Sequence, residues 1–70
     1  MPYANNAELP APVRHVLPWD AQVIFRKAFN HAFERYHGDE VTAFRIAWTA
    51  VKRDYEKVQG HWLPKWVFEA

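Results

Sequence analysis

Prolines and glycines divide this chain into short segments, and that division constrains its fold more than any other feature of the sequence. Pro10 and Pro12 suit the first turn of one helix, and Pro18 stops that helix and begins the next. Gly38 is placed to end the second helix in a left-handed conformation, and Gly60 is placed to end a third. We therefore expect helices over residues 10–17, 18–37 and 40–58.

Apolar residues recur at steps of three and four in both longer segments, which is the pattern of helices that bury one face. In 18–37 this face is wide enough to contact two neighbours, whereas in 40–58 it is a narrow stripe. Twelve aromatic residues among seventy supply the bulk that so small a core needs. The expected core consists of Phe25, Ala28, Phe29, Ala32, Tyr36, Phe44, Trp48, Val51, Tyr55 and Trp62.

The two ends of the chain are predicted to be extended, over residues 1–9 and 61–70. The C-terminal tail is rich in strand-forming residues, but Pro64 limits it to an edge strand or a strap. We expect it to pair with residues 2–4. The predicted fold class is mainly α: one domain over residues 1–70, with one short and two longer antiparallel helices and a tiny two-stranded sheet or strap from the two ends.

Composition excludes several functional classes. The sequence contains neither serine nor cysteine, so hydrolases that use these nucleophiles and thiolate zinc sites are excluded. Two isolated glycines cannot form a phosphate-binding loop. With no signal-peptide pattern and no apolar run long enough to span a bilayer, we expect a cytoplasmic protein without membrane insertion. We expect no enzymatic activity, no cofactor and no small-molecule substrate.

A set of short motifs extends along most of the chain. The motifs are Met1–Tyr3, Leu9–Pro10, Val13, His15–Pro18, Ala21–Gln22, Ile24, Ala28–Asn30, Ala32, Tyr36, Ala47–Trp48, Val51–Lys52, Tyr55, Gly60 and Trp62. Together they resemble the ChaB family of small bacterial and viral proteins, up to about Lys65. The resemblance implies a helical fold with a small terminal sheet and a role in regulating cation transport. That role is the label of bacterial members encoded beside a sodium or calcium/proton antiporter. Those members commonly carry a longer acidic segment where this chain has only residues 37–40.

Two polar clusters and one isolated histidine are candidates for metal or catalytic sites. Residues 37–40 offer a ring nitrogen and two carboxylates, but calcium needs six to eight oxygen ligands, so we interpret them as helix caps. His31 and Glu34 lie one helical turn apart without a second ligand pair, so we interpret them as part of a solvated face. We expect His15 to be a hydrogen-bonded structural residue. The sequence therefore predicts no metal site and no catalytic residue.

Two groups of residues remain as candidate partner-binding positions. Trp66 and Phe68 lie beyond the periodic core, and they are predicted either to pack onto it or to form a hydrophobic patch for a partner or a second copy. Arg45, Lys52 and Arg53 lie on the basic face of the third helix and could contact phosphates. We predict a non-enzymatic regulator or adaptor that binds another protein. The alternative is a nucleic-acid-binding accessory protein, of the kind a virus could encode, that uses this basic face.

Overall fold

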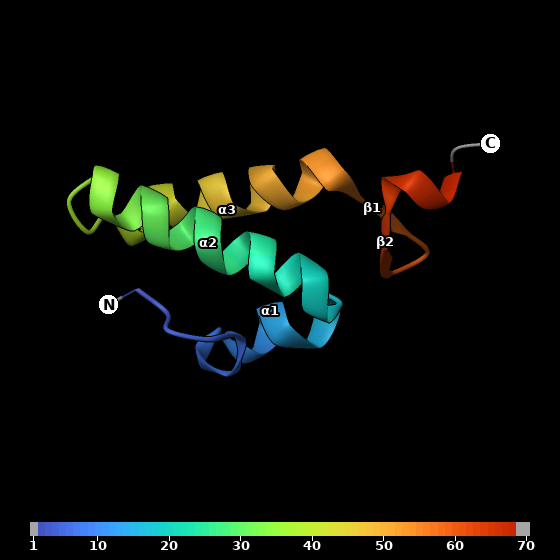
Figure 1. The fold of residues 1–70 in the computed structure, drawn as a ribbon, viewed down its shortest axis with the longest axis horizontal. Helices are drawn as coiled ribbons and strands as arrows, with labels where there is room; N and C mark the ends of the chain where they lie inside the picture. Colours follow the sequence, from blue (N-terminus) through green and yellow to red (C-terminus); the bar gives the residue numbers. More distant parts are fainter. Residues whose placement is uncertain (1, 69–70) are drawn as a thin grey trace.

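Two antiparallel helices lie side by side and form the body of the molecule (Figure 1). The computed structural model describes residues 2–68, so residues 1, 69 and 70 of the expected domain lie outside the described part. The elements are η1 (Asn6–Glu8), α1 (Ala11–Val16), α2 (Trp19–Arg35), α3 (Glu40–Asp54), β1 (Tyr55–Val58), β2 (His61–Pro64) and η2 (Lys65–Phe68), where η marks a 3-10 helix. The predicted class, mainly α with three helices and a two-stranded sheet, is confirmed.

Local signals set the helix ends close to their expected positions. Pro10 directly precedes α1, and Pro12 occupies its first turn. At the end of α2, the Gly38 N–H donates to the carbonyl oxygen of Phe33, five residues earlier, at 2.8 Å. This is the 6→1 hydrogen bond of a Schellman motif. The left-handed conformation begins one residue earlier than predicted, because His37 has φ 56° and Gly38 has φ 83°.

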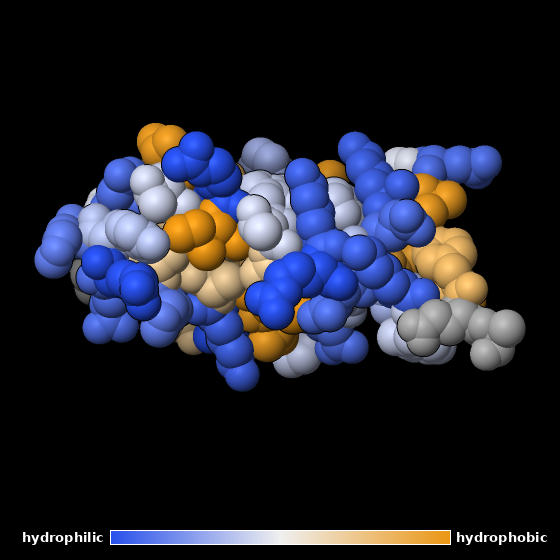
Figure 2. Space-filling view, turned by 90° about the horizontal axis from the view of Figure 1, so that it is seen from above, coloured by the Kyte–Doolittle hydropathy of each residue, from blue (hydrophilic) through white to orange (hydrophobic). Residues whose placement is uncertain are grey.

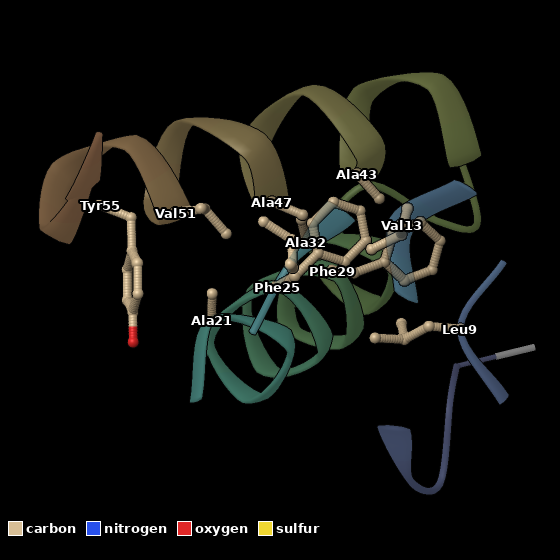
Figure 3. Packing of buried hydrophobic residues seen from close by; sticks show 11 residues of the cluster. Leu9, Val13, Ala21, Phe25, Phe29, Ala32, Ala43, Ala47, Val51 and Tyr55 are labelled. Carbon is tan, nitrogen blue, oxygen red and sulfur yellow. The ribbon is translucent and has the colours of Figure 1, made fainter. Parts of the chain in front are cut away.

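The core lies between α2 and α3, and α1 contributes Val13 to it (Figure 3). Alanines line the contact between the two long helices, where their small side chains let the backbones approach closely: Ala21, Ala32, Ala43 and Ala47 are all buried. The Phe25 and Phe29 rings are buried beside this contact. The Phe25 ring meets Phe44 edge-on at 5.3 Å between centroids, an arrangement that aromatic pairs favour.

Most residues that were expected in the core are at least half-buried. Phe25, Phe29, Ala32, Val51 and Tyr55 are buried, and Ala28, Phe44, Trp48 and Trp62 are partly buried. Tyr36 was wrongly expected there, because its side chain is 44 % exposed. It is the residue at which α2 ends, and its ring lies under the Arg35 guanidinium, 6.0 Å away, instead of between the helices.

The N-terminal segment lies against α2 and does not pair with the C-terminal tail. The expected pairing of the two ends is therefore wrong. Oδ1 of Asn30 accepts from the Tyr3 N–H at 2.8 Å, and Nδ2 of Asn30 donates to the Tyr3 carbonyl oxygen at 2.7 Å. One amide side chain therefore satisfies both backbone groups that a neighbouring strand would have paired. The segment is also not extended throughout, because it contains η1.

The third helix ends four residues earlier than expected. α3 stops at Asp54, and the chain enters β1 at Tyr55 with φ −129° and ψ 151°. Strands β1 and β2 then pair with each other to form an antiparallel hairpin. The tail is likewise not extended over all of residues 61–70, because β2 is followed by η2. The sheet therefore comes entirely from the C-terminal third of the chain.

Candidate functional site

The hairpin projects past the end of the helix pair and gives the molecule its elongated shape, 41 × 20 × 17 Å (Figure 1). Only Gln59 and Gly60 connect the strands, with φ values of 50° and 83°. Two successive left-handed residues form a type I′ turn, whose twist matches that of a tight hairpin. Gly60 therefore belongs to the hairpin turn and does not end a helix.

One face of the hairpin is turned toward the helices. Side chains alternate along a strand, so Tyr55 and Lys57 of β1 share a face, and Trp62 of β2 lies on it directly opposite Lys57. The Trp62 ring packs on Trp48 of α3 at 5.6 Å between centroids. Tyr55 is only 8 % exposed, and its ring extends toward Ala21 at the start of α2 (Figure 3). These two aromatic contacts hold the hairpin against the helical body.

A hollow of about 290 Å³ lies at the junction of α3, the hairpin and η2. Its lining residues are Lys52, Tyr55, Glu56, Lys57, Trp62 and Lys65. Aromatic side chains from the inner face of the hairpin thus meet lysines from three different elements. Burial raises the pKa of the Tyr55 phenol above its ordinary value, and the carboxylates of Asp20 and Asp54 raise it further.

Beside the hollow, η2 presents three consecutive apolar side chains to solvent. Trp66 is 70 % exposed, Val67 is 48 % exposed and Phe68 is 52 % exposed. Figure 2 shows uncovered hydrophobic surface at this end of the molecule, next to hydrophilic side chains. We call Trp66, Val67 and Phe68 the aromatic tail. Of the two outcomes predicted for Trp66 and Phe68, packing onto the core is wrong.

The basic residues predicted from the third helix are divided between the hollow and the rest of the α3 surface. Arg45, Lys52 and Arg53 are all exposed on α3, but only Lys52 lines the hollow. Its companions there are Lys57 and Lys65. Lys65 was missed, because nothing local to it indicates that η2 returns to the end of α3. Gln59-Gly60, directly before the strand-forming residues of 61–64, is a weak local indication of a hairpin turn.

The remaining polar candidates lie on the surface of the helical body. Asp39 caps α3, because its Oδ1 accepts from the Thr42 N–H at 3.2 Å and its Oδ2 from the Thr42 hydroxyl at 2.8 Å. These hydrogen bonds from Thr42 lower the pKa of Asp39. His31 and Glu34 are exposed on α2. His15 is exposed on α1, so the expectation of a structural histidine is not supported.

Within residues 2–68, no three His, Cys, Asp or Glu side chains are grouped so that they could hold a metal ion. Among the described helices, none is both long and apolar enough to traverse a bilayer.

Comparison with protein families matches the ChaB family over residues 9–65. The chain belongs to the ChaB family. A ChaB relative from Escherichia coli strain K12, named "Putative cation transport regulator ChaB", is 42 % identical over 66 residues, covering 81 % of this chain and 87 % of the relative. The solution structure of a ChaB protein with the same name superimposes with a TM-score of 0.82 at 39 % identity, covering 91 % of this chain and 99 % of that one.

A viral protein is also similar. The "Uncharacterized 10.9 kDa protein in LEF8-FP intergenic region" of Lymantria dispar multicapsid nuclear polyhedrosis virus is 38 % identical over 64 residues, covering 91 % of this chain and 65 % of the viral protein. The bacterial ChaB relatives are named as regulators and not as enzymes. The hollow lies within the residues that match ChaB, and the aromatic tail begins directly after them.

Proposed function

We propose that this ChaB protein regulates cation transport without catalysis, by binding a transport protein from the cytoplasmic side through its aromatic tail. The observation that carries the proposal is the exposure of Trp66, Val67 and Phe68 on η2. The name of the bacterial relatives supplies the process, cation transport.

Physical chemistry favours contact with a protein over simple exposure of these side chains. Tryptophan is among the residues that most often dominate the binding energy of an interface, because its large ring loses much water when it enters a pocket. Three adjacent apolar side chains make a surface that a partner can cover in one step. Lys65 precedes them, so the complementary partner surface is an apolar groove with acidic residues at its edge.

The proposal can be tested with everted Escherichia coli membrane vesicles that contain a sodium or calcium/proton antiporter. Purified protein is added, the antiport rate is followed by a pH-sensitive dye, and co-sedimentation measures binding. Trp66→Ala/Phe68→Ala should weaken binding by at least ~2 kcal/mol, roughly 30-fold, the loss typical of interface anchors. The wild-type effect on the antiport rate should disappear with it.

Trp19→Ala is the matched control, because Trp19 is 68 % exposed but lies at the start of α2. This control should bind and act like the wild type. Vesicles from cells that lack the antiporter give the background. The proposal fails if wild-type protein neither sediments above background nor alters the rate, or if the tail variant behaves like Trp19→Ala.

The nucleic-acid alternative retains one supporting feature, the exposed cations of α3. Arg45 and Lys52 are separated by seven residues, about 10 Å along a helix, and acidic side chains at Asp54 and Glu56 follow. We keep this alternative as an outcome of the next experiment.

A further inference from the structure

The hollow between α3 and the hairpin combines three lysines with two aromatic side chains. Lys52 comes from the last turn of α3, Lys57 from β1 and Lys65 from the start of η2. Three different elements thus each contribute one lysine to the lining of the hollow. Glu56 is the single acidic residue in the lining, so the hollow carries an excess of two positive charges, whereas the whole chain carries a net charge of only +1.

The floor of the hollow is apolar and held in place. Tyr55 is buried, and Trp62 rests on Trp48, so neither ring needs to be ordered when a ligand arrives. Contact with an apolar side chain would remove water from the Trp62 surface that faces the hollow. Lower local polarity also strengthens the attraction between a lysine and an anionic group.

We propose that this hollow binds an acidic peptide segment, with carboxylates at Lys52, Lys57 and Lys65 and an apolar side chain against Trp62. The inference rests on the proposed function, because it names the chemistry of the partner segment that would lie beside the aromatic tail. The segment is an extended stretch of glutamate or aspartate that contains one leucine-like residue.

Two observations favour a peptide over a nucleic acid as the ligand. A volume of about 290 Å³ is just below the range for small-molecule sites, ~300–1,000 Å³, and suits a few side chains. Single-stranded nucleic acids stack on open aromatic faces, and Trp48 already packs against Trp62.

The test uses the full chain and a fluorescein-labelled peptide of eight glutamates with one central leucine. Anisotropy is recorded at about 0.01 M and about 0.15 M salt, because screening weakens exposed charge pairs. Lys52→Gln/Lys57→Gln/Lys65→Gln should weaken binding at least tenfold at low salt. Arg14→Gln/Lys27→Gln/Arg35→Gln removes the same charge from exposed positions outside the hollow and should weaken peptide binding less than threefold.

Three further ligands test the charge, the apolar contact and the polymer class separately. A peptide with glutamine in place of glutamate should bind at least tenfold more weakly, and replacing its leucine with glycine should weaken binding several-fold. An oligothymidylate of equal length tests the nucleic-acid alternative. If the oligothymidylate binds more tightly than the acidic peptide and is sensitive to the hollow triple variant, the inference is overturned in favour of nucleic acid.

The inference is also overturned if both triple variants lose peptide binding equally, because the attraction then depends on net charge alone. Its failure is distinguishable from failure of the proposed function. The antiporter experiment depends on Trp66 and Phe68, and the peptide experiment on the lysines of the hollow. If Trp66→Ala/Phe68→Ala abolishes the antiporter effect while no acidic peptide binds, the proposed function stands and the hollow is not its peptide site.

Discussion

Replacing Asn30 with alanine should detach the N-terminal segment from α2. The Asn30 side chain makes two hydrogen bonds to the backbone of Tyr3, at 2.8 Å and 2.7 Å, in a partly buried setting. Each such bond contributes ~0.5–1.5 kcal/mol, so Asn30→Ala should lower the free energy of unfolding by about 1–3 kcal/mol. A chain of this length has a total stability of about 4–10 kcal/mol, so the loss is a substantial fraction.

The assay combines thermal unfolding with amide hydrogen exchange. For a domain of this size each kcal/mol lowers the melting temperature by roughly 4–8 °C, so the expected decrease is easily measured. Exchange of the Tyr3 amide should accelerate, while the amides of buried Phe25 and Val51 follow only the change in global stability. Asn5→Ala is the control, because Asn5 is exposed and its side chain does not cap η1.

A double-mutant cycle shows whether the hydrogen bonds also hold the Tyr3 ring on Phe29, where the centroids are 4.9 Å apart. If they do, Asn30→Ala should cost less in a Tyr3→Ala background, with a coupling of at least ~0.5 kcal/mol. The reasoning is refuted if Asn30→Ala unfolds within about 0.3 kcal/mol of Asn5→Ala and leaves Tyr3 exchange unchanged, since two real bonds would exceed that difference.

Three further predictions concern the packed contact between α2 and α3, the hairpin turn and the cap of α3. Ala47→Leu overfills a fully buried position and should cost about 1–3 kcal/mol in denaturant unfolding, whereas Thr49→Leu on the exposed face should be nearly neutral. Gly60→Ala should cost ~1–2 kcal/mol through backbone strain alone, because φ is +83° and no atom lies within 4 Å of the added carbon; NMR shifts of the hairpin would report it. The folded state lowers the pKa of Asp39, so the stability that its carboxylate contributes is present above pH ~4 and lost as the pH falls through the lowered value. Asp39→Asn cannot titrate, so its melting temperature should fall less than that of the wild type between pH ~5 and ~2.

Helix starts and turns were predictable because their causes are local. Pro10, Pro12 and Pro18 act through their own backbone geometry, and Asp39 caps α3 through the Thr42 groups three residues away. The periodic positions of Phe25, Phe29 and Val51 similarly follow from helix geometry alone. Tyr36 shares that periodicity, but it lies just after the last residue of α2, where its side chain is 44 % exposed.

The hairpin was not predictable by the same reasoning. Glu56 and Lys57 are good helix formers, and Val58 continues the apolar spacing of α3, so local preference favours a longer helix. The deciding contact is between Trp48 and Trp62, fourteen residues apart, which a helix continued through Val58 would have prevented. The candidate site inherits this difficulty, because Lys52, Lys57 and Lys65 come together only after the hairpin has formed. The sequence left two alternatives for Trp66 and Phe68, packing on the core or exposure to solvent. Only the structure shows that both side chains are exposed.

The direct passage from Asp54 of α3 into Tyr55 of β1 leaves no linker residue between helix and strand. The direction of the hairpin is therefore set by the rotational phase of α3. One residue inserted between Trp48 and Tyr55 would turn the hairpin by 100° about the helix axis and move it 1.5 Å, carrying Trp62 away from Trp48. Insertions and deletions should consequently be rare between Trp48 and Trp62 in ChaB proteins. The turn between α2 and α3 can lengthen, because its length does not determine how the hairpin is oriented relative to α3. The positions of insertions among ChaB sequences should therefore show which connections in the fold fix the orientation of the next element and which do not.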